Sequence, residues 1–335
     1  FAAVESLAVL PALAMLSRES MPPVNVVDVG ANVGDFSAEV VGSMGHLELN
    51  RRTQNYMLHL VAVEPSPLAF SIMSARAKRG DWNRTGKVVL VQQAAGDRAG
   101  EATLYGCSSA VPPCVETGCM PDEIENWCSL SPDASMVQHY RNKAPEAVTV
   151  SVAKLDVLLS RHFHRSELIH LLKVDCEGHD HEVLRGAAHI LAERRVRWLI
   201  FEASERWQMD GMSGRLLDVV DWLGKLGYAC VALLPGAMVP LDTNEHWRSI
   251  GEVVQRRESN VLCAQRSDPE WQRLVPAYSY DTTASGYTLD FLQKTSSSRK
   301  LPWNLQPPRA KAAVANLANI DWRNIPLEYL RTVGE

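Results

Sequence analysis

A short loop near the start of the chain carries residues suited to binding a cofactor. The stretch VNVVDVGANVGDF begins at Val24 and contains Asp28, Gly30, Asn32 and Gly34. Dinucleotide sites require G-x-G-x-x-G, whereas this loop is G-x-x-x-G and has Asn32 where the second glycine should be. The spacing therefore predicts no pyrophosphate cradle. It is typical of S-adenosylmethionine (SAM) sites, where glycines let the backbone approach the ligand and Asp28 and Asn32 could bind the methionine amino and carboxylate groups.

Two further positions could complete such a cofactor site. Glu64 ends the second predicted strand, where a carboxylate can accept hydrogen bonds from both ribose hydroxyls. Its alternative role is a favourable charge at a helix N-terminus. Gln93 and Ala94 leave the third predicted strand and are predicted to contact the adenine, with Asp97 as a less favoured choice and an ordinary turn as the alternative.

A group of charged residues at the end of the fourth predicted strand could act on the substrate. Lys173, Asp175 and Glu177 alternate in sequence, so an extended backbone would direct all three side chains to one side. In a functional interpretation, Asp175 or Glu177 positions or deprotonates an acceptor hydroxyl. In a structural one, Lys173 is the counter-charge of the two acids, because buried charges need partners.

The residues that follow leave a metal site open as an alternative. His179, Asp180 and His181 complete D-x-E-G-H-D-H, in which carboxylates and imidazoles could bind a divalent ion. Asp180 could equally cap the start of a helix, and we predict no metal. Glu202 ends the fifth predicted strand at the same edge and is an open candidate for substrate contact. Three other histidines are predicted to be surface or connection residues: His162, His164 and His170.

Three blocks of sequence resemble one known family. DVGANVGDFS, VAVEPSPLAF and KVDCEGHDHEVLRGA occur in the order found in the FkbM family of SAM-dependent methyltransferases, and the resemblance spans Val24 to Arg266. It implies SAM as the cofactor and O-methylation of a hydroxyl on a sugar, glycan or secondary metabolite.

Two other functions compete with this interpretation. A catalytically silent methyltransferase fold could serve as a binding module, although the intact Asp28, Gly30, Gly34 and Glu64 argue against it. A nicotinamide-dependent oxidoreductase on a similar sheet is disfavoured by the spacing of the glycine loop.

The elements that must position these residues alternate along the chain. Seven apolar runs are predicted as strands: Val24–Val29, His59–Val63, Val88–Val91, Ile169–Val174, Val196–Phe201, Tyr228–Leu234 and Val261–Ala264. Five helices are predicted: Asp35 onward, Leu68–Arg79, Ala153–Ser160, His181–Ala192 and Leu216–Leu226. Such alternation predicts an α/β fold with parallel, right-handed crossovers. The resemblance implies the class I SAM-methyltransferase (Rossmann-like) fold, a doubly wound seven-stranded sheet in which the last hairpin inserts one antiparallel strand.

The sequence divides the chain into three parts of different character, the second of which contains these elements and an insertion. Residues 1–23 are predicted to be an N-terminal helical segment, whose apolar run Leu7–Leu16 is too short to span a membrane. Residues 24–266 are predicted to form the methyltransferase domain, with a Cys-rich, turn-rich insertion at 107–143 that is either a functional excursion such as a substrate lid or a partly mobile insertion. Residues 267–335 form a tail without a functional interpretation.

Charge and composition restrict the partners. The chain has 335 residues, 46% hydrophobic and 22% charged, with a net charge of −5. These values are ordinary for a globular enzyme and disfavour a nucleic-acid partner, which requires a clustered basic surface. A small-molecule or glycan substrate is expected, and the oligomeric state is left open.

The cysteines and one sequon bear on the compartment. Cys107, Cys114, Cys119 and Cys128 cluster in the insertion and are either disulfide-bonded or free, whereas three others are predicted to be buried thiols: Cys176, Cys230 and Cys263. The sequon that begins at Asn83 favours the secretory route. The compartment is left open between cytoplasm and secretory lumen.

Overall fold

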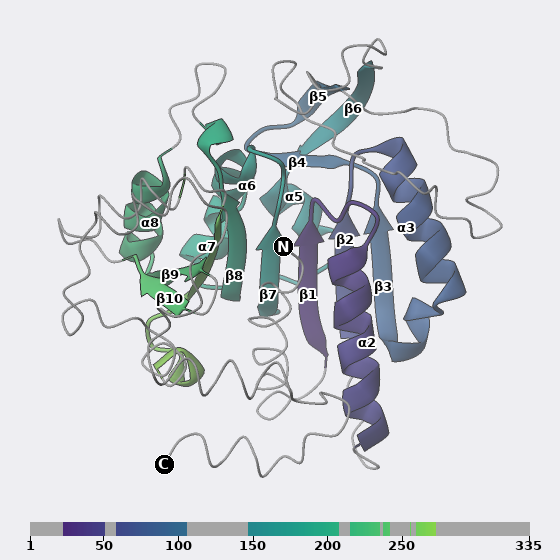
Figure 1. Cartoon of the computed structure of the whole chain (residues 1–335), viewed down its shortest axis with the longest axis horizontal. Helices are drawn as coiled ribbons and strands as arrows, with labels where there is room; N and C mark the ends of the chain where they lie inside the picture. The colour runs from purple at the N-terminus through teal and green to yellow at the C-terminus, as the bar shows by residue number, and fades with distance from the viewer. Residues whose placement is uncertain are drawn as a thin grey trace, which may run out of the picture.

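The computed structural model describes seven parts of the chain: residues 23–50, 58–105, 147–207, 215–234, 237–241, 255 and 259–272 (Figure 1). The predicted helix at Leu7–Leu16, the four clustered cysteines of the insertion and the tail beyond residue 272 lie outside these residues. None of the described helices combines the length and apolar content that spanning a bilayer requires.

An eight-stranded sheet forms the centre of the described structure, in the order β10-β9-β11-β8-β7-β1-β2-β3. Its strands are β1 (Val24–Val29), β2 (Leu58–Val63), β3 (Gly86–Val91), β7 (Ile169–Val174), β8 (Val196–Ala203), β9 (Tyr228–Leu234), β10 (Ala237–Pro240) and β11 (Ser259–Gln265). The seven predicted strands are all present, and β11 lies between β8 and β9, antiparallel to both. The predicted count of seven is one too low, because β10 pairs antiparallel with β9 at the edge and becomes a second strand of reversed direction.

Helices cover both faces of this sheet, as the strand composition requires. Every residue of β1, β2 and β7 is buried, which suits β-branched and aliphatic side chains on both faces. On one face Val27 and Val29 pack with α5 (Leu155–Ser160), α6 (Asp180–Gly186), α7 (Ala188–Ala192) and α8 (Leu216–Lys225). On the other face Val24 and Val26 pack with α2 (Asp35–Asn50) and with Met73 of α3 (Pro67–Arg79). The predicted single helix at His181–Ala192 is divided into α6 and α7.

A second, three-stranded sheet lies beyond the carboxyl ends of the central strands, at the top of Figure 1. It consists of β4 (Ala94–Gly96), β6 (Ala147–Lys154) and β5 (Gly100–Tyr105), with β6 parallel to β4 and antiparallel to β5. The second sheet covers the carboxyl edge of the central sheet (Figure 1).

Two of the three predicted buried thiols form a disulfide instead. Cys230 in β9 and Cys263 in β11 lie directly opposite each other in the antiparallel register, and their sulfur atoms are bonded at 1.97 Å. Both residues are buried. The prediction was wrong for this pair because the register that joins residues 33 positions apart is a tertiary property. Cys176 is a free thiol.

The chain continues to pack on the sheet after Arg266. Asp268 accepts a hydrogen bond from Nε of Arg197 in β8. The ring of Trp271 lies edge-on to that of Trp198, with centroids 5.8 Å apart, and both rings are buried. The first residues of the predicted tail therefore belong to the same hydrophobic core as the sheet.

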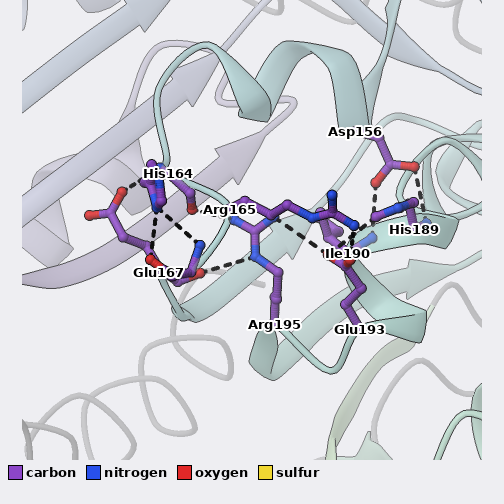
Figure 2. Close-up of polar contacts among 9 residues, drawn as sticks. Asp156, His164, Arg165, Glu167, His189, Ile190, Glu193 and Arg195 are labelled. Carbon is purple, nitrogen blue, oxygen red and sulfur yellow. Dashed lines mark hydrogen bonds and ion pairs between the residues drawn. The ribbon is translucent and has the colours of Figure 1, made fainter.

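A polar network fixes the connections around the start of β7 and β8 (Figure 2). The Asp156 carboxylate of α5 accepts hydrogen bonds from the backbone amides of His189 (3.0 Å) and Ile190 (3.1 Å), and so satisfies the first turn of α7 from outside the helix. Arg195 donates a hydrogen bond to the His164 carbonyl at 2.8 Å. These contacts anchor the amino end of β7, whose carboxyl end carries the candidate catalytic residues.

His170 differs from its prediction as a surface residue, because it is a buried member of β7. Its Nδ1 accepts a hydrogen bond from the Asn25 backbone amide at 3.0 Å, which requires a neutral ring. Burial, with a smaller contribution from the charge of Arg197, lowers the pKa of His170 to about 4. The folded state therefore resists protonation of this ring.

We expect His170 to make the fold sensitive to acid. Its folded pKa lies below the unfolded value of 6.5, so its contribution to stability is complete above pH 6.5 and is lost as the pH falls toward 4. The free energy of unfolding should fall by roughly 3 kcal/mol from this group. His170→Gln should flatten that slope in urea unfolding at a series of pH values, whereas His164→Gln, at an exposed loop position, should leave it unchanged. An unaltered slope in His170→Gln would contradict the assignment.

Candidate functional site

A pocket lies at the carboxyl edge of the central sheet, beneath the second sheet. Its walls come from the ends of β1 and β2, the segments after β3 and β7, and strands β4 and β5. It is lined by Val29, Gly30, Asn32, Val63, Glu64, Pro65, Gln93, Ala94, Ala95, Leu104, Asp175, Cys176, Glu177 and His179. Parallel α/β sheets bind ligands at this edge, where the strand order changes direction.

The glycine loop has its own amides occupied. The Gly30 and Ala31 amides both donate to the Val63 carbonyl, at 2.9 and 3.0 Å, and the Gly34 amide donates to the Ala31 carbonyl at 2.8 Å. The Asn32 amide donates to Oε2 of Glu64 at 2.8 Å. A phosphate cradle presents free amides to its anion. The amides of this loop are already occupied, and the loop instead holds the Glu64 carboxylate in place.

The two glycines of the loop are required for different reasons. Gly30 has φ +77, and a Cβ atom there would lie 1.8 Å from the Asp175 carbonyl oxygen, so glycine permits β1 and the segment after β7 to meet at the pocket. Gly34 has φ +84 and packs against Met73 and Trp82. Gly34 does not line the pocket, and its close approach is to side chains of the protein.

Glu64 is a buried carboxylate at the centre of this arrangement. Besides the Asn32 amide, it accepts the Ser66 amide at 2.7 Å through Oε1, which ties it to the turn before α3. Burial raises the pKa of Glu64 to about 7, although both amide hydrogen bonds act in the opposite direction. Each carboxylate oxygen retains a lone pair, so the group can accept further hydrogen bonds from a ligand in the pocket.

Asp28 lies behind the pocket rather than in its lining. It is fully buried, its Oδ2 accepts a hydrogen bond from Ser37 of α2 at 2.7 Å, and its Oδ1 lies 3.9 Å from Nζ of Lys173. Burial raises the pKa of the Asp28 carboxyl, and Lys173 opposes this shift. We predicted that Asp28 contacts the amino group of a ligand. The buried position of Asp28 behind the pocket does not favour this contact, which stays a prediction.

Lys173 joins Asp28 to the pocket wall. Its buried ammonium donates to Oδ2 of Asp175 at 2.9 Å and lies 5.4 Å from the centre of the Phe36 ring. Asp175 lines the pocket, and its backbone amide is held by the Val29 carbonyl at 2.9 Å. The predicted pairing of Lys173 with Asp175 is therefore present, and it fixes the orientation of a carboxylate that faces the pocket.

Glu177 does not share this cation, which corrects one part of the sequence interpretation. β7 ends at Val174, and Glu177 adopts a left-handed backbone with φ 50 in the turn before α6, so strand alternation does not reach it. Its Oε2 forms an ion pair with Arg206. Glu177 nevertheless lines the pocket together with Asp175. The two acids meet at one wall with separate cations.

The histidines and aspartate after Glu177 point in different directions. His179 lines the pocket and contacts Glu182 at 3.1 Å through Nδ1. Asp180 is buried, and its Oδ1 accepts the Cys176 amide at 3.2 Å. His181 is buried against the Trp207 ring, with ring centroids 5.2 Å apart. Within the described part of the chain, no three His, Cys, Asp or Glu side chains gather as a metal site.

The remaining candidates divide between the pocket and its surroundings. Gln93 and Ala94 both line the pocket, and the side-chain amide of Gln93 donates to Oγ of Ser151 in β6 at 3.3 Å. Asp97 lies outside the lining and forms an ion pair with Arg185 at 3.7 Å. Glu202 lies within β8 opposite Asn260 and is also outside the lining.

Several residues at the site were not assigned to it from the sequence, among them Arg206, Leu104 and Cys176. Arg206 follows β8 in a short turn, and its only sequence signal is a basic residue soon after a strand end. Leu104 reaches the pocket from the second sheet. Cys176 is a pocket-lining thiol between two acids, and burial raises its pKa well above the usual value.

Comparisons with known proteins relate the chain to methyltransferases. The model of the methyltransferase FkbM domain matches residues 28–230. Among solved structures, the chain is similar to the N-terminal domain of human METTL16, with 10% identity, a TM-score of 0.37, and coverage of 78% of this chain and 69% of that one. It is also similar to a SAM-dependent methyltransferase from Agrobacterium tumefaciens, with 8% identity, a TM-score of 0.36, and coverage of 78% and 62%. No curated protein matches the sequence.

Proposed function

Because the chain belongs to the FkbM methyltransferase family and is therefore a SAM-dependent methyltransferase of class I fold, we propose that it methylates a hydroxyl group. The acceptor in this proposal is a sugar, a glycan or a hydroxylated secondary metabolite.

The pocket suits SAM by the chemistry of its lining. Glu64 offers a buried acceptor for ribose hydroxyls, and Gln93 and Ala94 lie where the adenine would be held under the proposal. Val63 and Leu104 supply apolar surface for a ring. Asn32 adds an exposed polar side chain from the glycine loop. Occupied loop amides agree with a cofactor that has no phosphate to bind.

SAM supplies an activated methyl group, and the residues of this chain must then orient the acceptor and manage its proton. Asp175 is the residue proposed to accept that proton, since a carboxylate within reach of a hydroxyl can act as a general base. Lys173 holds Asp175 at 2.9 Å, and Asp28 lies beyond it, so the base is fixed from behind by buried groups. Glu177, held by Arg206, is proposed to position the acceptor.

The observation that carries this proposal is the pair of carboxylates on one pocket wall, each with its own cation, near a separate carboxylate suited to ribose. Fixed alignment of the two reactants supplies much of the rate in a displacement, so oriented acids are useful even where proton transfer is secondary.

We expect the protein to bind SAM and S-adenosylhomocysteine but not NAD, and to transfer label from SAM to hydroxylated acceptors. Calorimetry with the three cofactors tests the binding. Incubation with methyl-labelled SAM and a mixed panel of glycans, hydroxylated metabolites and RNA tests the acceptor class. Label found only on the bases of RNA would overturn the hydroxyl proposal, and binding of SAM without transfer to any acceptor would favour a silent binding module.

A further inference from the structure

The sequon Asn83-Arg84-Thr85 occupies an exposed position of the folded chain. It lies in the short 3-10 helix η1 (Trp82–Thr85) between α3 and β3, where Asn83 and Arg84 are exposed. Trp82 is buried in the core beneath it and anchors the segment. A sequon can carry a glycan in a folded protein only if its asparagine faces solvent, and this one meets that condition.

The hydrogen bond of Asn83 leaves the reactive atom outside the interaction. Oδ1 of Asn83 accepts the Val88 backbone amide at 3.1 Å. The acceptor must be the amide oxygen, because an amide nitrogen only donates. Nδ2, the atom to which a sugar is attached, is not used in this contact. The bond orients the side chain without occupying that nitrogen.

The position of the sequon is compatible with an active site. Residues 82–85 precede β3, whereas the pocket lies beyond the carboxyl end of that strand. Six residues of β3 separate the two by about 20 Å. Figure 1 shows β3 running from the end opposite to the second sheet. A glycan at Asn83 would therefore leave the pocket open.

The disulfide supplies an independent observation about the compartment. Cys230 and Cys263 are bonded across β9 and β11 inside the hydrophobic core. Stable structural disulfides form in oxidising compartments, whereas reducing systems keep cytosolic thiols free. The secretory lumen is the compartment in which both disulfide formation and N-glycosylation take place.

From these two observations we propose that Asn83 is an N-glycosylation site of a chain that folds in an oxidising secretory compartment. The donor is an oligosaccharide linked to a polyisoprenoid diphosphate. A bond forms between Nδ2 of Asn83 and the anomeric carbon, the bond from that carbon to the diphosphate oxygen breaks, and the diphosphate leaves with the electron pair. The amide nitrogen loses one proton.

The test uses the full chain isolated from its own cells. Peptide mapping before and after treatment with peptide N-glycosidase in heavy-oxygen water should show a glycan on the peptide that contains Asn83, and conversion of that asparagine to aspartate with one heavy oxygen. An Asn83 peptide found only in unmodified form would overturn the proposal. Mapping under non-reducing conditions should recover Cys230 and Cys263 as one linked pair, and two free thiols in this material would overturn the assigned compartment.

Matched variants separate the sequon from other sites. Thr85→Ala and Asn83→Gln, expressed in the same cells, should lose the mass of one glycan, whereas Thr85→Ser preserves the sequon and should keep it. All three should bind SAM as the parent does, because neither Asn83 nor Thr85 lines the pocket. Retention of the glycan in a folded, SAM-binding Thr85→Ala variant would contradict the assignment.

Discussion

Replacement of Asp175 by asparagine is expected to lower the turnover number by about 10²- to 10⁴-fold, the usual worth of a general base. The substitution keeps the shape of the side chain but removes its ability to accept a proton. Affinity for SAM should remain nearly unchanged, because the ribose and adenine contacts are proposed for Glu64, Gln93 and Ala94. Single-turnover transfer of labelled methyl groups and calorimetric SAM binding measure the two quantities separately.

Glu177 provides a comparison, because it lines the same wall of the pocket as Asp175. Glu177→Gln should also lower turnover with SAM affinity preserved, but it removes an ion pair with Arg206 rather than one with Lys173. Addition of a chelator should have little effect on either variant or on the parent, since the proposed base acts without a metal. If both variants fold, bind SAM and turn over at the parental rate, the two acids are structural partners of their cations and the proton leaves by another route.

The sequence was sufficient to predict seven of the eight strands of the central sheet and several of the residues that line the pocket. β1, β2 and β7 are continuous apolar runs, because each is buried on both faces, and such runs are legible without tertiary information. Since the carboxyl ends of parallel strands meet at one edge, Gly30, Glu64 and Asp175 could be assigned to one site from their place after a strand.

The sequence was insufficient where the backbone leaves the regular strand. The alternation of Lys173, Asp175 and Glu177 assumes that β7 continues, but the chain turns after Val174 and Glu177 takes a positive φ. Its partner Arg206 is 29 positions away. A side chain that acts across a turn has no periodic signal, so this ion pair required the fold.

Pairings between distant elements were also beyond sequence reasoning. The disulfide depends on the register of β9 and β11, and a shift of one residue would place the two cysteines on opposite faces of the sheet. Asp28 illustrates the same limit in another form. Its place before the glycine loop suggested ligand contact, yet Ser37 and Lys173 occupy its surroundings and it is fully buried.

Glu64→Ala is expected to weaken SAM binding by about 1.5 to 3 kcal/mol, or roughly 10- to 150-fold, at a pH where the parent carboxyl is ionised. Glu64 is held at the pocket by two hydrogen bonds, from the Asn32 and Ser66 amides. The alternative role, a charge before α3, is consistent with the same Ser66 contact. An unchanged dissociation constant in Glu64→Ala would support that alternative.

The pH dependence of binding distinguishes these roles more sharply. Because burial raises the pKa of Glu64 to about 7 in the free protein, the carboxyl is largely protonated below that pH. Ribose hydroxyls that donate to the ionised form must lower this pKa on binding, so SAM affinity should rise as the pH increases through 7 and become constant above it. Below pH 7 the loss of SAM affinity approaches tenfold per pH unit.

Two variants test this assignment. Glu64→Gln, which cannot ionise, should bind SAM weakly with no such slope, and Glu193→Gln, near the opposite edge of the sheet, should retain the parental profile. A parental slope in Glu64→Gln would assign the titration to another group, and a flat parental profile would mean that the ionised carboxylate does not receive the ribose.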